Sequence, residues 1–431
     1  MSRRAAFFTL GCKVNQNEAE SLKALFRDRG YEIVSFQESA EVYVIHTCTV
    51  THLADRKSRQ MIRRSKRKNP ESLVVVSGCY AQVSPEEVKQ IEGVDLILGT
   101  KDRRRMVDLV EQTASDKISS LVEKMSEHEL FEELPTPATS RTRSYLKVQE
   151  GCNQFCTYCI VPYARGPVRS RMLESAYNEA CRLVGKGYKE IVLTGIHLGS
   201  YGYDLERTDL NQLLLNLETV PGLERLRISS LDPHEFTPEI LKTISDSDVI
   251  CPHFHIPLQS GDEWILERMG RRHSAEDYLK LVDKLKGLIP EAAITTDVIV
   301  GFPGENEKRY QHTRYIIEKV QFSDLHVFKY SPRKGTPAAD YTNQVSPEVK
   351  DARSKELISL GRELKGSYAS KFTGQNLEVL VETEENGILE GHTKNYLRVK
   401  FEGPKDYIGS IMPVKIGVYK KGYSNGRLEK F

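Results

Sequence analysis

Three closely spaced cysteines constrain the chemistry of this chain more than any other feature. Cys152, Cys156 and Cys159 follow the spacing C-x3-C-x2-C, so one short loop can turn all three thiols toward one centre. Three thiolates leave one iron of a cubic four-iron, four-sulfur cluster without a protein ligand, whereas such clusters are normally held by four cysteines. An iron without a protein ligand is a binding position, as in open catalytic zinc sites. Buried structural thiols and a closed zinc knuckle with a distant fourth ligand are the alternative interpretations.

The composition is that of a soluble globular protein with two or three domains. The chain has 431 residues, of which 39% are hydrophobic and 28% charged, and it exceeds the usual size of one domain. No apolar run approaches the ~20 residues of a membrane span. The apolar run at residues 5–8 is too short for a signal peptide, so a cytoplasmic location is expected. The 8 cysteines favour metal or redox chemistry over disulfides.

Three further cysteines end strand-like segments in the first part of the chain. These segments are residues 6–12, 42–48 and 73–79. Helical patterns separate them, which predicts a parallel α/β sheet. Their last residues are Cys12, Cys48 and Cys79. Because open α/β sheets bind ligands at the carboxyl ends of their strands, the three thiols are predicted to meet in a second three-cysteine site. Cys181 and Cys251 are interpreted as structural residues.

Positive charge is concentrated in this first part of the chain. Residues 56–68 form a helical pattern in which nearly every charge is positive, and this favours contact with RNA phosphate over a merely solvated face. A second basic cluster, residues 101–105, precedes the expected end of the domain at residue 115. Residues 116–143 are predicted to be a linker.

Six strand-like segments alternate with helical stretches between residues 144 and 368. These segments are residues 145–149, 191–194, 226–229, 254–258, 293–300 and 325–330. Six successive βα units predict an incomplete TIM-like barrel, with its site where the loops after the strands gather. The loop that carries Cys152 follows the first of these strands, which places the three-cysteine loop at that face.

The last part of the chain, residues 369–431, predicts a small antiparallel β-barrel of the OB type. Expected strands are residues 377–381, 387–392, 396–401, 412–416 and 427–430. The sequence Glu-Glu-Asn-Gly at residues 384–387 is a hairpin signal. Lys394, Tyr396 and Arg398 combine positive charge with an aromatic ring, which is typical of phosphate contact and base stacking.

The order of these parts resembles the methylthiotransferase family of radical S-adenosylmethionine (SAM) enzymes. The C-x3-C-x2-C spacing that ends at Cys159, with the aromatic Tyr158 before this last cysteine, is similar to the radical SAM signature. The C-terminal part resembles the RNA-binding TRAM domain. Motifs at residues 10–15, 47–51 and 165–171 are similar to the MtaB branch, which methylthiolates N6-threonylcarbamoyladenosine at position 37, next to the anticodon of tRNA. One departure is His46, where asparagine usually precedes Thr-Cys; this change is conservative.

The resemblance implies two 4Fe-4S clusters and two SAM molecules per turnover. The radical cluster would be held by Cys152, Cys156 and Cys159, and the auxiliary cluster by Cys12, Cys48 and Cys79. One SAM would methylate a sulfur atom, and the second would yield a 5′-deoxyadenosyl radical that allows transfer of the methylthio group to adenine C2. The implied partners are the anticodon stem-loop of tRNA, an electron donor such as flavodoxin or ferredoxin, and a sulfur donor.

Further site residues are expected where the barrel strands end. Together with Tyr158, the candidates for binding SAM are Thr194, Gly195, His197, Gln259, Asp297, Val300 and Gly301. Glycine permits close approach of an adenine and a ribose, although a tight turn or a satisfied barrel residue also explains each position taken alone. The candidates for binding the threonyl carboxylate or nearby phosphates are Arg165, Arg169 and Arg171. Guanidinium groups bind such anions through two hydrogen bonds, and a salt-bridged surface loop is the alternative.

Three other functional interpretations follow from the same sequence. One is a sister methylthiotransferase that acts on isopentenyladenosine in tRNA or on a ribosomal-protein aspartate; the TRAM-like part and the basic helix favour tRNA. Another is a radical SAM methyltransferase or sulfur-inserting synthase. The last is a non-catalytic iron-sulfur protein that carries electrons or binds RNA. An electron carrier needs closed clusters with four cysteines, and both groups of cysteines here contain three.

Overall fold

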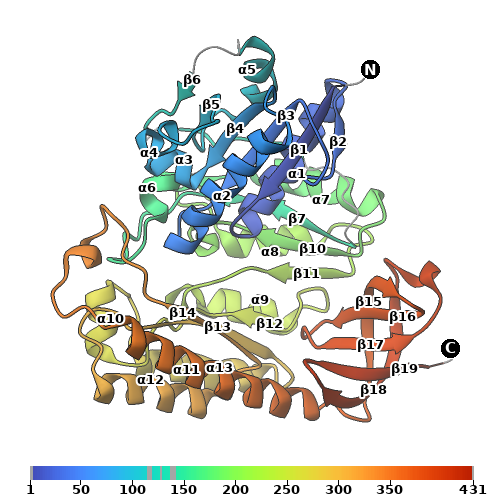
Figure 1. Ribbon diagram of the computed structural model, residues 1–431. Coiled ribbons are helices and arrows are strands. Elements are labelled where there is room, and N and C mark those ends of the chain that lie inside the picture. Colours follow the sequence, from blue (N-terminus) through green and yellow to red (C-terminus); the bar gives the residue numbers. More distant parts are fainter. Residues whose placement is uncertain (1–2, 114–118, 127–128, 136–141, 430–431) are drawn as a thin grey trace.

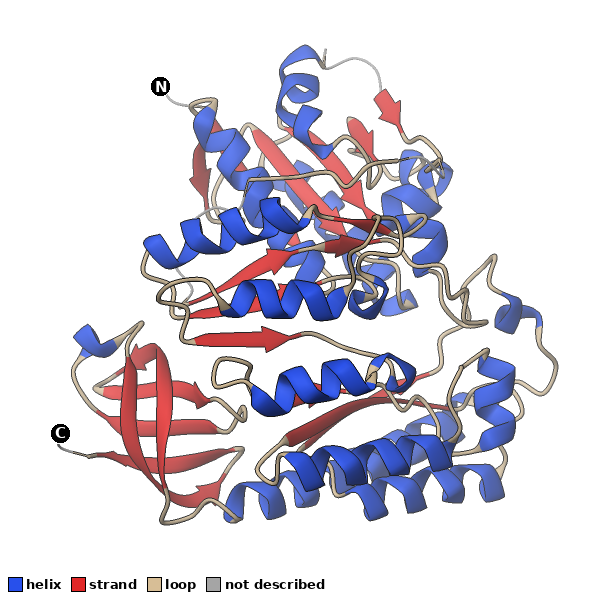
Figure 2. Cartoon of the chain, turned by 180° about the vertical axis from the view of Figure 1, so that it is seen from behind, coloured by secondary structure: helices blue, strands red, loops and turns tan. Residues whose placement is uncertain are grey.

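The computed structural model describes residues 3–113, 119–126, 129–135 and 142–429. These residues form an N-terminal α/β domain, a central barrel of parallel strands and helices, and a small C-terminal β-barrel (Figures 1 and 2). The N-terminal domain lies over the first strands of the central barrel, and the C-terminal barrel stands beside it. Within these ranges no helix combines the length and the apolar character needed to cross a bilayer.

The N-terminal domain is built on a parallel sheet of six strands in the order β2-β1-β3-β4-β5-β6. Its strands are β1 Arg4–Thr9, β2 Glu32–Val34, β3 Val42–Thr47, β4 Leu73–Gly78, β5 Leu96–Leu98 and β6 Ser119–Leu121. The three predicted strands are confirmed as β1, β3 and β4, which are neighbours in the sheet. Strands β2, β5 and β6 were missed because three residues are too few to show a periodic pattern.

The segment expected to be a linker does more than connect two domains. Strand β6 pairs in parallel with β5 and extends the N-terminal sheet by one strand. Residues 116–118, 127–128 and 136–141 of this segment lie outside the described residues. Farther along the segment, Glu132 forms an ion pair of 2.8 Å with the buried Arg103. Part of the segment therefore packs onto the N-terminal domain.

Helices cover both faces of the N-terminal sheet. They are α1 Lys13–Asp28, α2 His52–Lys68, α3 Cys79–Val83, α4 Pro85–Lys89 and α5 Met106–Gln112. Helices α1 and α5 bury Phe26 and Met106 against one face, and α2 buries Met61 and Ile62 against the other. The predicted basic helix is α2. It packs through this narrow apolar stripe.

The central barrel contains six parallel strands that follow one another in sequence order, as predicted. These strands are β7 Arg143–Lys147, β10 Glu190–Thr194, β11 Arg225–Ile228, β12 His253–His255, β13 Ala293–Val300 and β14 Asp324–Lys329. A parallel bridge between Leu226 and Ile250 joins the two groups of three strands. The surrounding helices are α7 Leu173–Gly185, α8 Leu210–Glu218, α9 Pro238–Asp246, α10 Glu263–Met269, α11 Ala275–Leu288, α12 Glu307–Val320 and α13 Pro347–Ser370. The largest apolar core lies between these strands and helices.

Two short elements flank the three-cysteine loop at the top of the barrel. Strand β8 Gln149–Glu150 pairs in an antiparallel manner with β9 Arg169–Ser170. Helix α6 Val161–Arg165 lies between them in the sequence. The loop therefore begins and ends at one two-stranded ribbon, which fixes both of its ends.

The C-terminal part is a closed barrel of five strands, as predicted. Its strands are β15 Asn376–Glu385, β16 Ile388–Thr393, β17 Arg398–Glu402, β18 Ile411–Lys420 and β19 Tyr423–Leu428. The expected hairpin joins β15 to β16, with φ of +53° at Asn386 and +80° at Gly387. Two successive residues in the left-handed region are what a type I′ turn requires. The barrel closes through a parallel contact between β17 and β19; its other pairings are antiparallel.

The C-terminal barrel closes the floor of the central barrel through Tyr396. The Tyr396 ring stacks with the imidazoles of His253 and His392, with centroid distances of 4.5 and 4.7 Å. The guanidinium carbon of Arg227 lies 4.7 Å from the centroid of the same ring. Arg225 donates one hydrogen bond of 3.0 Å to the backbone oxygen of His392 and another of 3.0 Å to that of Glu378. Aromatic stacking and cation–π contacts thus join the two barrels.

The residues proposed from sequence to bind RNA in this barrel already have partners within the protein. The Tyr396 ring is stacked with the imidazoles of His253 and His392. Arg398 pairs with Glu390 at 2.5 Å, and the Lys394 ammonium donates a hydrogen bond to the backbone oxygen of Asp248. Contact of these three residues with RNA stays a prediction.

Replacement of Tyr396 by alanine is expected to lower the free energy of unfolding by about 3 kcal/mol, because it removes a large aromatic ring and its stacking contacts. Urea denaturation measures this change. Tyr315, which is 59% exposed on α12, supplies the control: Tyr315→Ala should change stability by less than about 0.5 kcal/mol. A Tyr396→Ala protein of unchanged stability but weakened RNA binding would show that the ring serves RNA instead.

Candidate active site between two groups of cysteines

The N-terminal triad, which consists of Cys12, Cys48 and Cys79, lies at the carboxyl ends of three adjacent strands. Cys12 caps α1 after β1, Cys48 follows β3, and Cys79 begins α3 after β4. The thiols are close enough to influence one another. Burial raises the pKa of Cys48 to about 12, and the neighbouring thiols of Cys79 and Cys12 contribute to this increase. The structure therefore brings these three side chains together.

The loop triad, which consists of Cys152, Cys156 and Cys159, gathers in the loop after β8. The backbone N–H of Cys159 donates to the carbonyl of Cys156 at 2.9 Å, which turns the chain sharply there. Burial and then the thiols of Cys156 and Cys152 raise the pKa of Cys159 to about 12. Cys181 lies on α7, and Cys251 lies beside Arg227 at the barrel floor. Neither supplies a fourth thiol to a triad.

Each triad has an arginine beside one of its thiols. Arg165 donates from Nε to Sγ of Cys79 at 3.3 Å. Arg271 Nη1 lies 3.7 Å from Sγ of Cys156. Burial raises the pKa of both thiols, and the two guanidinium charges act against this by lowering it. Because metal ligation requires the thiolate, these positive charges suit an anionic iron-sulfur cluster at either triad.

A buried ion network joins the N-terminal domain to the central barrel. Glu18 of α1 and Glu150 of β8 are its carboxylates, and both are fully buried. Arg165 Nη1 donates to Glu18 at 2.6 Å and to Glu150 at 2.7 Å. Arg103 and Lys147 contact both carboxylates as well. Burial raises the pKa of Glu18, but the three cations more than compensate and hold this pKa well below its usual range.

This network fixes the two triads relative to each other. Arg165, from the helix after the loop triad, contacts Cys79 of the N-terminal triad and the Asn15 amide oxygen at 2.5 Å. Glu150 precedes the loop triad by two residues. Neither Glu18 nor Arg103 was predicted, because charged residues on separate elements carry no sequence signal of a shared site. Only the folded chain brings them together.

The three arginines expected to bind substrate anions are buried. Arg165 has no exposed surface, and Arg169 and Arg171 are 3% and 7% exposed. Arg169 lies 3.8 Å from Glu150, and Arg171 donates to the hydroxyl of Ser175. A direct contact of these three guanidinium groups with substrate stays a prediction.

The first group of predicted SAM-binding residues lies beside the loop triad. His197 Nε2 lies 2.6 Å from the Glu235 carboxylate. Burial lowers the pKa of His197, but hydrogen bonds to Asp232, Cys152 and Glu235 raise it to about 12. A Cβ atom added at Gly195 would come within 2.9 Å of the Gln149 side chain, so any larger residue there would force Gln149 to move. The other members of the group are Tyr158, which is half-buried near Arg271, and Thr194, whose hydroxyl donates to the carbonyl of Val192.

The second group lies on strands β12 to β14. Asp297 is 3.3 Å from His255 and 3.1 Å from His326, and despite burial these hydrogen bonds lower the pKa of Asp297. Gln259 donates its backbone N–H to the carbonyl of Asp297 and has φ of +62°. Gly301 has φ of +75°, and the Val300 side chain packs in the core, so Val300 offers a ligand only its backbone. His326 was not predicted, because one polar residue in a strand carries little signal.

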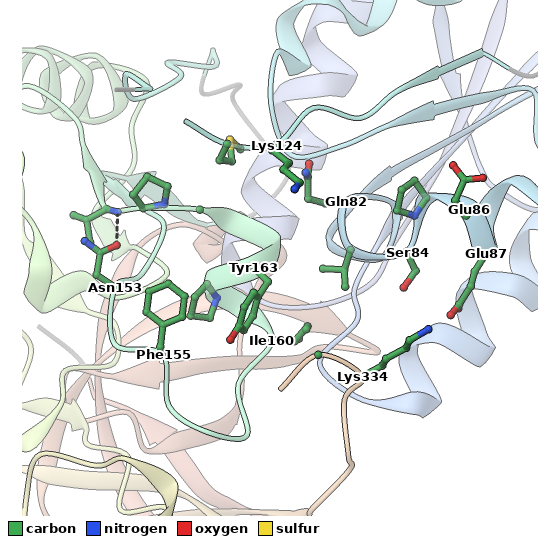
Figure 3. Close-up of a pocket in the computed structure, with 18 of the residues that line it drawn as sticks. Gln82, Ser84, Glu86, Glu87, Lys124, Asn153, Phe155, Ile160, Tyr163 and Lys334 are labelled. Carbon is green, nitrogen blue, oxygen red and sulfur yellow. Dashed lines mark hydrogen bonds between the residues drawn. The ribbon is translucent and has the colours of Figure 1, made fainter. Parts of the chain in front are cut away.

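An open cavity of ≈1120 Å³ borders both cysteine loops (Figure 3). On one side it is lined by Gln82 and Ser84, which follow Cys79, and on the other by Phe155 and Tyr163 of the loop-triad segment. The two rings meet edge to face at 5.6 Å and remain 53% and 47% exposed. Lys334 approaches from the loop after β14. This cavity exceeds the usual size for a small ligand and offers aromatic surface.

Comparisons with known proteins identify the family. Residues 4–99 match the model of uncharacterized protein family UPF0004, and residues 146–315 match the radical SAM superfamily. The threonylcarbamoyladenosine tRNA methylthiotransferase MtaB of Bacillus subtilis (strain 168) is 47% identical, over 97% of this chain and 94% of that protein. The chain belongs to the radical SAM methylthiotransferase family. Its members are enzymes, and the superfamily implies SAM and a 4Fe-4S cluster, for which the loop triad is suited.

Other relatives and solved structures agree with this assignment. The MtaB protein of Aquifex aeolicus (strain VF5) is 40% identical, over 96% of this chain and 100% of that protein. A tRNA-2-methylthio-N(6)-dimethylallyladenosine synthase of Clostridium botulinum (strain Okra / Type B1) is 36% identical, over 95% and 93%. The radical SAM methyltransferase TsrM from Kitasatospora setae shares the fold, with a TM-score of 0.57 at 15% identity over 79% of this chain and 77% of that chain.

Replacement of Glu18 by glutamine is expected to lower the free energy of unfolding by about 3–5 kcal/mol at neutral pH, because it leaves buried cations without their carboxylate. The wild-type pKa of Glu18 is lowered by folding, so its stabilisation is complete above the unfolded pKa of about 4.3 and is lost as pH falls toward the folded value. Denaturant unfolding at several pH values measures both effects.

The matched control is Glu71→Gln, which removes an exposed carboxylate from the same domain. It should change stability by less than about 0.5 kcal/mol. Equal stability of the Glu18→Gln and Glu71→Gln proteins at neutral pH would contradict the structural role of the network.

Proposed function

We propose that this protein methylthiolates C2 of N6-threonylcarbamoyladenosine at position 37 of tRNA. The observation that carries the proposal is the 47% identity, over nearly the whole chain, to a methylthiotransferase named for this nucleoside. The arrangement of the two triads also supports it, because the reaction requires radical and sulfur chemistry at one base. Arg165 contacts Cys79 of the N-terminal triad and Glu150, which lies just before the loop triad. Relatives named for dimethylallyladenosine are less similar, at 36% identity.

An anticodon loop fits the surface beside the triads. Bases of single-stranded loops can be splayed out and stacked on aromatic side chains. Phe155 and Tyr163 offer such a surface at the cavity, with Lys334 nearby. The backbone of Phe155 has φ of +48°, a conformation that costs free energy outside glycine and occurs at functional sites. Helix α2 adds positive charge for RNA phosphate.

The proposed chemistry uses a cluster at each triad. Adenine C2 is an unactivated aromatic carbon, so acid–base catalysis offers little there, and the radical chemistry comes from SAM and iron-sulfur cofactors. Cys152, Cys156 and Cys159 would hold the radical cluster, and the N-terminal triad an auxiliary cluster that carries the sulfur. Arg165 and Arg271 stabilise one thiolate in each set. Two SAM molecules are consumed in each turnover.

The reaction also requires partners that supply electrons and sulfur. Reductive cleavage of SAM needs an electron donor such as flavodoxin or ferredoxin. The methylthio group needs a sulfur donor, since SAM supplies only its methyl group.

Mass spectrometry of nucleosides tests the proposed activity. Threonylcarbamoyladenosine-containing tRNA is incubated with the anaerobically reconstituted protein, SAM and a strong reductant, and a gain of one methylthio group on this nucleoside is expected. A gain on isopentenyladenosine alone would replace the proposed substrate but keep the family activity. No modified nucleoside, despite cleavage of SAM, would contradict a tRNA substrate.

The two triads are expected to differ in function. Cys156→Ala should abolish reductive cleavage of SAM, because it removes a ligand of the radical cluster. Cys79→Ala should spare this cleavage yet abolish methylthio transfer. Chromatography of 5′-deoxyadenosine and of the nucleosides measures both activities. Loss of cleavage in a folded Cys79→Ala protein with an intact radical cluster would contradict this division, and Cys181→Ala is the matched control.

A further inference from the structure

Lys13 projects from the N-terminal domain toward the central barrel. It is the first residue of α1 and directly follows Cys12. One turn later on the same face of the helix, Asn17 donates from Nδ2 to the backbone oxygen of Tyr145 at 3.0 Å. Tyr145 belongs to β7, the first strand of the barrel. The face of α1 that carries Lys13 is therefore turned toward the barrel.

Lys13 is accessible and lies near charged groups of the two barrels. Both Lys13 and Cys12 are exposed. Burial nevertheless lowers the pKa of Lys13, while Tyr396 raises it and the charges of Arg227 and Arg143 lower it. These neighbours come from the C-terminal barrel, β11 and β7. The ammonium group of Lys13 thus lies within electrostatic range of both barrels.

The ammonium group of Lys13 has no carboxylate partner within 4 Å among the described residues. Glu190, whose charge raises the pKa of Lys13, pairs with Arg227 at 2.7 Å and with Arg143 at 3.7 Å. Glu382 pairs with Arg143 at 3.0 Å. The carboxylates of Glu190 and Glu382 are therefore already paired with arginines. This leaves a positive charge that a ligand can neutralise.

The proposed substrate carries the complementary group. Its threonylcarbamoyl substituent ends in a carboxylate, whereas an isopentenyl substituent is uncharged. An ion pair strengthens when water is partly excluded from it. An uncharged substituent in the same space would leave the ammonium unpaired and would be disfavoured. Arg165, the cation expected from sequence to bind this carboxylate, is occupied by Glu18 and Glu150.

We propose that Lys13 binds the threonylcarbamoyl carboxylate of the substrate adenosine and selects this nucleoside over analogues that lack the acid. The inference rests on the proposed function. Because Lys13 adjoins Cys12, the same contact would hold the adenosine beside the N-terminal triad. This is the triad whose cluster would carry the sulfur that is transferred to the adenosine. Lys13 is thus a residue that determines specificity and positions the base.

Equilibrium binding to two anticodon stem-loop RNAs tests this proposal. The RNAs differ only at position 37, which is threonylcarbamoyladenosine in one and adenosine in the other. The anaerobically reconstituted wild-type protein should bind the modified RNA about ten- to a hundredfold more tightly, the range of a charge-assisted contact. In Lys13→Met this ratio should fall to about one, because binding of the modified RNA weakens while binding of the unmodified RNA does not change.

Three controls make the result specific. Lys23→Met removes a cation of the same helix that pairs with Glu20 at 2.7 Å, and it should keep the wild-type ratio. Lys13→Arg retains the charge and should retain most of the ratio. Iron content shows that the clusters are loaded, and Lys13→Gln replaces Lys13→Met if the methionine variant loses iron.

The outcomes separate this inference from the proposed function. A wild-type ratio in the Lys13→Met protein, with methylthio product formed by the wild type, would overturn the role of Lys13 alone. A ratio near one already in the wild type, with product formed, would do the same. Absence of product on threonylcarbamoyladenosine would overturn the proposed function and the role of Lys13 with it.

Discussion

The structure depends on a set of buried charges between the N-terminal domain and the central barrel. Glu18 and Glu150 are held by Arg103, Arg165 and Lys147, and all five side chains are buried. Buried ion pairs seldom add net stability over an apolar core, but a charge left unpaired there is costly, so the partners must meet in one arrangement. The network therefore specifies how the two domains dock more than how firmly each one folds.

That docking creates the chemical site. The N-terminal triad and the loop triad lie on different domains, and Arg165 touches both the carboxylates of the network and a thiol of the N-terminal triad. Arg271 gives Cys156 a similar neighbour in the barrel. Charge supplied by arginine counteracts the burial that disfavours thiolates. The same docking leaves Lys13, next to Cys12, on the face of α1 that is turned toward the barrel.

The sequence predicted features with a local or periodic signal. Strand ends marked by Cys12, Cys48 and Cys79, six βα units and five short strands were all recognisable from pattern and spacing. Three-residue strands such as β5 were not recognisable, because three residues are too few to show an alternating pattern. The ion network and the role of Arg165 in it were also missed, because contacts between residues more than a hundred positions apart depend on packing. The burial of Arg165 could not be predicted either, because the sequence does not show which arginines the fold encloses.

Iron analysis tests most directly whether the two separate three-cysteine sites each hold a cluster, as proposed. The anaerobically reconstituted protein should contain about eight iron atoms per chain, four for each cluster. Replacement of Cys12, Cys48 and Cys79 together by alanine should leave about four, as should replacement of Cys152, Cys156 and Cys159. About four iron atoms in the wild type, unchanged when the N-terminal triad is removed, would contradict this proposal.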